Sequence, residues 1–573
     1  MKLMLRYVRR HLGMFLTAIF FLTIETLADL LQPTFMSFIV DEGVAKRDVR
    51  QILFYGGIML GIAALGAFGA VMRNIYASRT SQLIGKEMRM EIYEKVQTLS
   101  FENIDRLQPS SIITRITNDV TQIQNFLNGC MRIMMKAPIT CVGAIVLIIV
   151  QTPQQLPMIV VILLISAFLI AGNMKLGYPR FGILQRKLDR LNAVSREFLS
   201  SIRVVQAFRA EEREEEKFAD AAGDFAQAGV SAMRIMAVFG PFINLTVNLG
   251  IVVLLWISQT DNGGEIGRLM ASVNYMTQVL FSLGMVSNIL NMAVRALASS
   301  ARVEEVLKEK PAQELPERGA GPADIRGQVT FERVSFTYAS TSRPAVEDVS
   351  FQAEAGETIG IIGPTGSGKS TLMDLVPRFY DATSGRVKID GTDVREIDPG
   401  RLRRAIAVVP QKALLFSGSI LENLRWGDER ASEEDVKKAA CIACADEFVS
   451  AFPNGYETDL SQGGVNLSGG QKQRLSIARA LVRKPRILDD CTSALDANTE
   501  ARVLQGIRQE TANMTVLLIS QRISTVMRAD RILCLEDGRV KGFGSHQELL
   551  EQCAVYRAIY ESQIGAAGAP AGR

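Results

Sequence analysis

The residues best placed to do chemistry lie in "GPTGSGKS", Gly363–Ser370, which has the spacing G-x-x-x-x-G-K-[ST]. The stretch follows the apolar run "ETIGII" and precedes "TLMDLV", so we expect a loop between a strand and a helix. Glycines let backbone N–H groups approach phosphates, and the helix start adds partial positive charge. We expect Lys369 to reach the β and γ phosphates of ATP and Ser370 to hold Mg²⁺. The predicted ATP contacts from this stretch are Gly363, Pro364, Thr365, Gly366, Ser367, Gly368, Lys369, Ser370 and Thr371.

Two further stretches carry residues that are typical of phosphate and metal binding. In "LSGGQKQR", Leu467–Arg474, a serine and two glycines open a helix, which is again a phosphate-binding end. The residues concerned are Ser468, Gly469, Gly470 and Gln471. In "RILDDCTSALD", Arg486–Asp496, Asp489 and Asp490 follow an apolar run, as in the metal-binding strand end of an ATPase.

Taken together, these motifs closely resemble those of ABC ATPases. The resemblance implies that Ser468–Gln471 is the signature that completes the opposite ATP site of a dimer. It implies that Tyr338 in "VSFTYAS" stacks on adenine, and that Asp489 binds Mg²⁺. Gln411 in "VVPQKALLF" resembles the glutamine that senses Mg²⁺ and couples to the membrane part, and "SALD", Ser493–Asp496, resembles the loop that crosses the dimer seam.

Two residues depart from the family pattern at the same ATP site. The usual catalytic Glu is Asp490, and the usual switch histidine is Gln521 in "ISQRISTV". A positioned general acid or base contributes roughly 10²–10⁴ in rate. We therefore expect this chain's own site to bind ATP and to hydrolyse it poorly. Because the signature is intact, the pattern favours a heterodimer with one degenerate and one active site. A homodimer with two slow sites is the alternative.

The strand before these aspartates is unusually short. Only "RIL" separates Pro485 from Asp489, where the family usually has five residues. Central parallel strands are typically about five residues long and apolar. Either the strand borrows Arg486 and Lys484, or the preceding loop tightens, or the chain is impaired.

The elements that must position these residues fall into two unlike halves. Six segments before residue 300 are long and apolar enough to cross a bilayer, which takes about 20 residues: 14–39, 53–76, 133–152, 156–176, 232–257 and 266–295. The predicted fold class is an α-helical six-span transmembrane domain followed by an α/β P-loop ABC ATPase domain. The expected boundaries are 1–310 for the membrane domain, 311–326 for a linker, 327–565 for the nucleotide-binding domain and 566–573 for a flexible tail.

The segments 77–132 and 177–231 are basic and have helical spacing, so we expect them to extend the membrane helices into the cytoplasm. Both chain termini should lie on that side of the plasma or inner membrane. Within these segments, 102–120 and 196–212 resemble the two loop regions whose short coupling helices dock on the ATPase domains of this family.

Some polar residues lie inside the expected spans. Glu25 and Asp29 should face protein or a water-filled cavity, because a lone charge in lipid costs several kcal/mol. They could contact substrate, including a cation, or bond to a neighbouring helix near the bend at Pro33. A set of amides on the last two spans could line a polar cavity or hold helices together: Asn244, Asn248, Asn274, Gln278, Asn288 and Asn291.

Composition narrows the remaining functions. A net charge of +4 over 573 residues favours no nucleic-acid surface. Seven cysteines are scattered, and "CIAC" (Cys441 and Cys444) lacks the second pair or the histidines that a zinc site needs. No cleavable signal peptide is evident.

We therefore expect a subunit of an ATP-driven exporter for a hydrophobic or amphipathic drug, lipid or peptide, working with a second half-transporter in the lipid bilayer. A regulatory ABC protein that gates a partner is an alternative from another class. An importer is disfavoured because importers usually place the ATPase on a separate chain, and a peptide-processing exporter because no peptidase domain precedes the first span. The substrate itself is not readable.

Overall fold

The computed structural model describes residues 2–153, 156–258, 266–314, 316, 320–491, 495–510 and 514–565. The chain forms two compact units, one of Met1–Lys95 with Ser110–Lys308 and one of Val96–Pro109 with Glu309–Arg573. This division differs from the expected boundary at 310 because residues 96–109 group with the second unit. The expected tail at 566–573 and linker residues 315 and 317–319 lie outside the described part of the chain.

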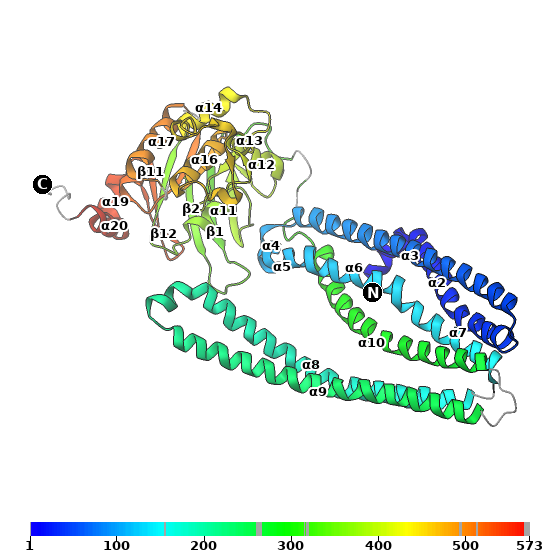
Figure 1. Cartoon of the computed structure of the whole chain (residues 1–573). Coiled ribbons are helices and arrows are strands. Elements are labelled where there is room, and N and C mark those ends of the chain that lie inside the picture. Colours follow the sequence, from blue (N-terminus) through cyan, green and yellow to red (C-terminus); the bar gives the residue numbers. More distant parts are fainter. Residues whose placement is uncertain are drawn as a thin grey trace. The chain divides into compact units, whose positions relative to one another are not determined.

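Long helices make up the first unit (Figure 1). They are α1 (Lys2–Arg10), α2 (Leu12–Phe38), α3 (Val49–Gln97), α5 (Pro109–Thr114), α6 (Val120–Gly129), α7 (Lys136–Gln151), α8 (Leu156–Ala207), α9 (Glu211–Ser258) and α10 (Ile266–Lys308), with short π-helical turns at Ile39–Val44, Arg115–Asp119 and Cys130–Met134. At about 1.5 Å per residue, α3 is roughly 73 Å long, more than twice the ~30 Å hydrocarbon core of a bilayer. The basic segments 77–97, 177–207 and 211–231 are therefore continuations of membrane helices, as predicted.

Five of the described helical stretches are long and apolar enough to cross a membrane: Leu12–Val44, Val49–Gln97, Pro109–Gln151, Val160–Ala207 and Glu211–Val253. The sixth expected span lies in α10, which is helical but more polar. Tyr275 and Val279 of α10 are buried against Leu30 of α2 and Ile148 of α7. Because protein covers this face, α10 needs fewer apolar residues than a helix surrounded by lipid.

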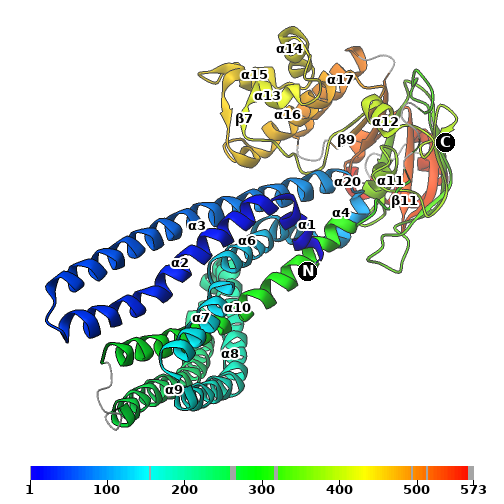
Figure 2. The same ribbon diagram turned by 90° about the vertical axis from the view of Figure 1, so that its right-hand side faces the viewer.

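Close helix packing in this unit depends on small residues. A Cβ atom on Gly66 would lie 2.8 Å from the Cβ of Ala28, and one on Gly69 would lie 3.1 Å from the carbonyl oxygen of Phe21. Glycines at these points let α2 and α3 approach closely, as is common where helices pack in membranes. Helices α8 and α9 run side by side along most of their length (Figures 1 and 2).

The described part of the second unit contains two main sheets and a small antiparallel pair formed by β7 (Gly418–Ser419) and β8 (Asp459–Leu460). The larger has the order β12-β11-β3-β10-β9-β6, in which β11, β3, β10, β9 and β6 are parallel and β12 is antiparallel to β11. Its strands are β3 (Thr358–Ile362), β6 (Ile406–Val408), β9 (Ile487–Cys491), β10 (Thr515–Ile519), β11 (Arg531–Glu536) and β12 (Arg539–Gly544). The smaller, antiparallel sheet has the order β2-β1-β4-β5, with strands β1 (Val329–Phe336), β2 (Val346–Ala353), β4 (Ser384–Ile389) and β5 (Thr392–Asp393). A helical membrane unit followed by this α/β unit confirms the predicted fold class.

The helices of the second unit are mostly short and packed on the larger sheet. They include α4 (Phe101–Leu107), α11 (Lys369–Leu375), α12 (Pro399–Ala405), α13 (Ile420–Arg425), α14 (Glu433–Ile442), α16 (Gly469–Val482), α17 (Ala497–Glu510), α18 (Ile523–Val526), α19 (His546–Gln552) and α20 (Ala554–Ile564). Every residue of β3 is buried. The loop that follows β3 is therefore anchored on a fully buried strand.

The structure shows how the chain accommodates the short strand before the two aspartates. Strand β9 includes Asp489 and Asp490 themselves, which pair with Leu517 and Leu518 of β10. Lys484 takes a left-handed conformation with φ 51°, so the loop tightens there and Lys484 is not lent to the strand. Arg486 does continue the ladder, because its N–H donates to Ala405 and its carbonyl accepts from Thr515. Two features therefore compensate for the short segment between Pro485 and Asp489. The loop before it makes a tight turn at Lys484, and Asp489 and Asp490 are themselves part of strand β9.

Candidate nucleotide-binding site

The carboxyl ends of four neighbouring parallel strands carry the predicted site residues. Strand β3 leads into Gly363–Ser370, β10 into Gln521, β9 contains Asp489 and Asp490, and β6 leads to Gln411. Since β3, β10, β9 and β6 are adjacent and parallel, their carboxyl ends lie at one edge of the sheet. Ligands of open α/β sheets bind at this edge. The order of the strands therefore brings together motifs that lie far apart in the sequence.

A cavity of about 250 Å³ opens at this edge. Its lining includes Thr365, Gly366, Ser367, Gly368, Lys369, Ser370, Thr371, Gln411 and Gln521. The structure thus brings the phosphate-loop residues, the expected Mg²⁺-sensing glutamine and the switch glutamine to one space. Gly363 and Pro364 contribute through their carbonyl oxygens, which both accept hydrogen bonds from Lys369.

Lys369 is a buried cation whose partners among the described residues are all neutral. Its Nζ donates to the carbonyl oxygens of Gly363 at 2.9 Å and Pro364 at 2.7 Å, and to the hydroxyl of Ser367 at 3.3 Å. The residue is 8% exposed, and burial lowers the pKa of its ammonium group. Among the described residues, no carboxylate oxygen forms a salt bridge with it. Such a cation is stabilised by an incoming polyanion.

The glycines of this loop are required by space as well as by conformation. A Cβ atom on Gly363 would lie 2.1 Å from the carbonyl oxygen of Leu535. Gly368, which caps α11, has φ +91° and would place a Cβ 2.4 Å from the carbonyl oxygen of Ala345. The first N–H groups of α11 have no hydrogen-bond partner inside the helix. The loop therefore fits a triphosphate, which accepts from these N–H groups and from Lys369.

The predicted metal ligands supply oxygen donors, which suit Mg²⁺. Ser370 and Gln411 line the cavity, and Asp489, 5% exposed, lies in the middle of β9. Asp489 is not among the lining residues. In the described part of the chain, no group of three or more His, Cys, Asp or Glu could hold a metal by itself. Mg²⁺ commonly uses few carboxylates together with phosphates and water, so these residues fit it.

Tyr338 lies beside the phosphate loop, outside the cavity lining. Its hydroxyl is 3.2 Å from Oγ1 of Thr371, in the first turn of α11. Its ring meets those of Phe336 and Tyr380 edge-on, with centroids 4.8 and 5.4 Å away. The predicted adenine-stacking ring is thus fixed to the phosphate-binding helix at one side and to an aromatic cluster at the other.

This cluster reaches helix α4, the first of the two expected coupling segments. The ring of Phe101 lies 4.7 Å from that of Phe379 and 6.2 Å from that of Tyr380. The hydroxyl of Tyr380 donates to Asp105 of α4 at 2.6 Å. An aromatic row therefore joins α4 to Tyr338. Sequence reasoning missed Phe379 and Tyr380, because nothing in "RFYDATSG" marks them as different from ordinary core residues.

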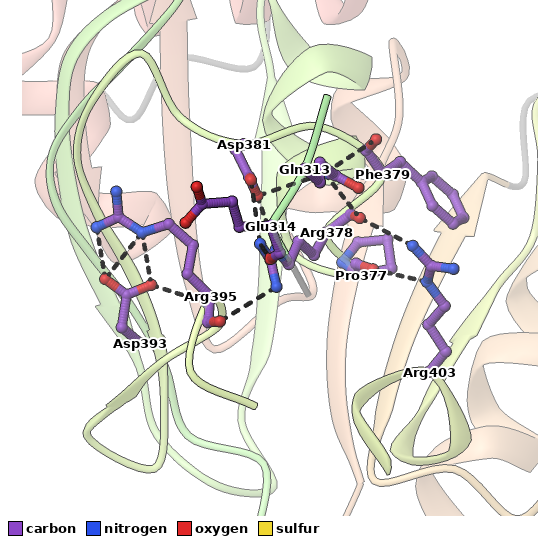
Figure 3. A network of polar contacts seen from close by, with 9 residues as sticks. All are labelled: Gln313, Glu314, Pro377, Arg378, Phe379, Asp381, Asp393, Arg395 and Arg403. Carbon is purple, nitrogen blue, oxygen red and sulfur yellow. Dashed lines mark hydrogen bonds and ion pairs between the residues drawn. The ribbon is translucent and has the colours of Figure 1, made fainter. Parts of the chain in front are cut away.

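A network around Arg378 fixes the turn that carries these two rings (Figure 3). Arg378 is 2% exposed and binds both carboxylate oxygens of Asp381 at 2.8 and 3.1 Å. It also donates to the carbonyl oxygens of Glu314 and Arg395, while Arg403 donates to the carbonyl oxygen of Arg378. The network attaches the start of the linker after α10 to the turn beside Tyr380.

The predicted signature begins helix α16, as expected. The Ser468 hydroxyl accepts from the N–H of Gln471, and the Gln471 side chain accepts from the N–H of Ser468 at 2.9 Å, which is a capping box. Ser468 and Gly469 are exposed, and a Cβ on Gly469 would meet no atom within 4 Å. The signature does not line the cavity of its own chain, and its helix start is open to a partner.

The loop that carries Gln521 is held from two sides. The amide of Gln563 in α20 donates to the carbonyl oxygen of Gln521 at 2.7 Å and accepts from the N–H of Ile523 at 2.8 Å. Arg522 donates to the carbonyl oxygen of Leu495, at the end of the "SALD" segment, at 2.8 Å. No local pattern marked Gln563. The side chain of Asp490 and residues 492–494 lie outside the described part of the structure.

The charged residues expected inside the spans form a cluster in the first unit. Glu25 forms ion pairs with Arg73 of α3 at 2.6 Å and with Lys136 of α7 at 2.8 Å, and Lys136 also pairs with Asp29 at 2.9 Å. Glu25 is therefore bonded to neighbouring helices, which is one of the two interpretations left open by the sequence. Sequence reasoning overlooked Arg73 and Lys136, although both lie inside expected spans.

The amide side chains of the last two expected spans lie in different environments. Asn274 and Gln278 line a cavity of the first unit, and Gln278 also donates to the carbonyl oxygen of Asp29 at 3.4 Å. Asn244 and Asn248 are exposed, and Asn248 donates to a carbonyl of its own helix. The side chains of Asn288 and Asn291 lie outside the described part of the structure.

Comparisons with known proteins agree with this architecture. The family described as "ABC transporter transmembrane region" matches residues 15–283, and that described as "ABC transporter" matches residues 346–493. YfiB, an ABC transporter ATP-binding protein of Bacillus subtilis, is 40% identical over 557 residues, covering 96% of each chain. The ATP-dependent lipid A-core flippase of Chromohalobacter salexigens is 30% identical, covering 98% of this chain and 97% of the flippase. The solved structure of a bacterial Atm1-family ABC exporter with ATP bound superimposes with a TM-score of 0.77 at 26% identity, covering 99% of both chains.

A membrane-spanning unit joined to a phosphate-binding α/β unit defines an ATP-driven membrane transport protein. The chain belongs to the ABC transporter family and is a half-transporter of the exporter type, with fused transmembrane and ATP-binding domains. Its ATPase domain binds ATP, and hydrolysis of ATP is coupled to transport.

Proposed function

We propose that this chain is the degenerate-site subunit of a heterodimeric exporter that moves a hydrophobic or amphipathic compound out of the cytoplasm. The observation that supports this is the placement of Gln521 in the same cavity as Lys369 and Ser370. Strand β10, which leads to Gln521, pairs with β9 at Leu518 and Asp490. Both departures from the family pattern therefore belong to one ATP site.

Each departure weakens hydrolysis for a physical reason. Asp490 is shorter than Glu by one methylene, about 1.5 Å of reach, which places its carboxylate farther from an attacking water. Gln521 can hydrogen-bond a γ-phosphate and cannot carry positive charge. The remaining groups, Lys369 and the loop N–H groups, bind phosphate without needing either residue. The site thus holds ATP and turns it over slowly.

A magnesium ion at this site would be held by Ser370, Gln411 and Asp489. When bound, it neutralises phosphate charge and orients the terminal phosphate. The chain's own contribution is to supply these oxygen donors at one edge of the sheet and to place Lys369 among them.

The open signature helix supports a working site across the dimer. Ser468 and Gly469 at the start of α16 are exposed, and the space beside Gly469 is empty in this chain. We propose that Ser468–Gln471 completes the partner's ATP site, where the partner supplies the catalytic residues. The intact signature would then sustain turnover although Asp490 does not.

The export direction follows from the proposed topology, with basic helix extensions and both termini in the cytoplasm. The lipid A-core flippase and the Atm1-family exporter, both similar over nearly the whole chain, support an export role and do not identify the substrate of this one. Two alternatives remain as outcomes of experiment: a homodimer with two slow sites, and a protein that gates a partner without transport. Uptake into inverted vesicles by the purified pair separates transport from gating.

Two substitutions on opposite ATP sites test the proposal. Asp490→Asn should change turnover of the heterodimer little, because the carboxylate is already unproductive. Gly469→Asp should reduce turnover by about 100-fold or more, because a negative charge enters where the partner's γ-phosphate approaches. Since Gly469 has open space around it, this change leaves the fold of the chain intact. Steady-state ATPase assays of the reconstituted pair give the ordering.

A gain-of-function variant completes this test. The double change Asp490→Glu with Gln521→His should raise hydrolysis by the chain expressed alone by roughly 100-fold, the scale of one positioned acid or base. If Asp490→Asn abolished turnover and Gly469→Asp spared it, the degenerate-site assignment would be wrong.

A further inference from the structure

The loop after β10, which carries Gln521, begins where the hydrogen bonds of the sheet end. Strand β10 ends at Ile519, and the ladder with β3 continues to Ser520, whose N–H donates to the carbonyl oxygen of Ile361 at 3.3 Å. Gln521 is the next residue along the chain, and it lines the nucleotide cavity. The orientation of its backbone therefore depends on contacts from outside the sheet.

The side chain of Gln563, near the end of α20, supplies two such contacts. Its Nε2 donates to the carbonyl oxygen of Gln521 at 2.7 Å, and its Oε1 accepts from the N–H of Ile523 at 2.8 Å. A side-chain amide carries a donor and an acceptor side by side. Gln563 therefore binds this segment much as the backbone of a neighbouring strand would. Because a carbonyl needs a donor and an N–H needs an acceptor, these partners also fix which way the amide is turned.

The bond to Ile523 serves a helix start that needs an acceptor. Ile523 is the first residue of α18, and the first N–H groups of a helix have no acceptor within it. Arg522, at the N-cap position, makes no side-chain cap to this helix among the described residues. Its side chain bonds the carbonyl oxygen of Leu495 and the carboxylate of Glu500 instead. Gln563 thus supplies the acceptor from another helix.

The helix that presents Gln563 is packed against the same core as the loop it holds. Tyr556, seven residues earlier and therefore on the same face of α20, is fully buried. It belongs to a cluster with Ile523 and Val526 of α18 and with Ile362, the last residue of β3. The phosphate loop starts directly after Ile362. Gln563 is therefore mounted on a core that also supports the phosphate loop.

We propose that Gln563 is a positioning residue of the ATP site, which holds the backbone of Gln521 so that the Gln521 side chain reaches the γ-phosphate. The inference rests on the proposed contact between Gln521 and the γ-phosphate, and it adds α20 to the elements that build the site. Gln563 is not among the residues that line the cavity, so it acts through Gln521. Loss of its amide should therefore weaken only those nucleotides that carry a γ-phosphate.

A comparison of two nucleotides tests this selectivity. The affinities of ADP and of the non-hydrolysable β,γ-imido analogue of ATP are measured with Mg²⁺ by titration calorimetry on the full-length chain in lipid nanodiscs. Gln563→Met keeps the length of the side chain and removes both hydrogen bonds. It should weaken binding of the ATP analogue about fivefold, the scale of one hydrogen bond, and leave the affinity for ADP unchanged. Gln552→Met, at an exposed glutamine that ends α19, should change neither affinity.

A second substitution assigns the effect to the switch residue. Gln521→Ala should also weaken the ATP analogue and spare ADP. Adding Gln563→Met to Gln521→Ala should weaken binding no further, because the side chain that Gln563 positions is gone. This lack of additivity separates positioning from a general effect on the fold.

Three results would overturn the proposal. Gln563→Met could weaken both nucleotides equally, could keep its full effect in the Gln521→Ala background, or could have no effect although Gln521→Ala selectively weakens the ATP analogue. If instead Gln521→Ala leaves the preference between the two nucleotides unchanged, the proposed γ-phosphate contact of Gln521 is wrong and the role of Gln563 falls with it. The single variants therefore distinguish a failure of this inference from a failure of the function on which it rests.

Discussion

Two regions of this molecule place a lysine in opposite electrostatic settings, a half-buried one in the membrane unit and a buried one in the nucleotide-binding unit. In the membrane unit, Lys136 lies between two carboxylates and its neighbour Arg73 neutralises one of them. In the nucleotide-binding unit, Lys369 has only carbonyl and hydroxyl partners among the described residues. A membrane interior cannot leave charge unpaired, since the cost is several kcal/mol. A nucleotide site can, because the missing counter-ion arrives with the ligand.

The difference teaches how each region is prepared for a ligand. The phosphate loop holds the positive charge of Lys369 without a carboxylate partner in the described part of the chain, and a triphosphate would neutralise it. We therefore expect strong ATP binding that depends on Lys369. The membrane cluster is close to neutral as a whole, because Arg73 and Lys136 balance Glu25 and Asp29, so it holds no uncompensated charge.

The largest effect should come from removing the uncompensated charge. Lys369→Ala should weaken ATP binding at this chain's own site by about 100-fold, since a buried charge-assisted contact with phosphate is lost. Lys388→Ala is the matched control, because Lys388 lies in the same unit and already pairs with Glu332 at 2.7 Å. Binding of a fluorescent ATP analogue to the full-length chain measures both. If the Lys369→Ala variant bound the ATP analogue with unchanged affinity, the assignment of Gly363–Ser370 as the phosphate-binding loop would be wrong.

An intermediate effect should follow from unbalancing the neutral cluster. Arg73→Met should lower stability by about 3 kcal/mol, because Glu25 stays buried with one partner fewer. The double variant Glu25→Gln with Arg73→Met should be clearly less destabilised than the sum of its single changes. Thermal unfolding of the detergent-solubilised protein measures this coupling.

The ion pair of Lys308, whose side chain is 75% exposed, with Glu304 provides the control for that measurement. Lys308→Met should change stability by about 0.5 kcal/mol or less, as is usual for surface ion pairs. Strictly additive effects of the Glu25 and Arg73 changes would show that the cluster does not act as a compensated unit.

The smallest effect concerns a carboxylate near α4. Burial, together with the charge of Asp105, raises the pKa of Asp374 to about 6. Between pH 4 and 6 the folded state therefore binds more protons than the unfolded state, so this contribution to stability is present at low pH and is lost as pH rises through about 6. Asp374→Asn should remove this dependence and raise stability at pH 7.5 by roughly 1 kcal/mol, after allowance for solvent screening.

Melting temperatures of the full-length chain at pH 5.5 and 7.5 test this expectation. Besides Asp105, the groups that face Asp374 include Tyr338, whose pKa is raised chiefly by burial and also by the charge of Asp374. Asp537→Asn, at an exposed carboxylate, should leave the pH dependence of the wild type unchanged. A wild-type stability that does not fall between pH 5.5 and 7.5 would contradict the raised pKa.

The sequence alone determined the features that contiguous residues encode. The phosphate loop after β3, the helix start at Ser468, and the long helices that continue out of the expected spans all follow from local spacing and periodicity. These motifs are readable because the residues that cooperate are neighbours along the chain.

Only the tertiary structure decided which distant residues meet. Lys136 bonds Glu25 across 111 positions and Tyr380 bonds Asp105 across 275, and no local pattern specifies either partner. The grouping of residues 96–109 with the second unit and the tight turn at Lys484 likewise depend on what packs around them. Helix periodicity fixes which face is buried, but the crossing and depth of neighbouring helices and strands select the partner on that face.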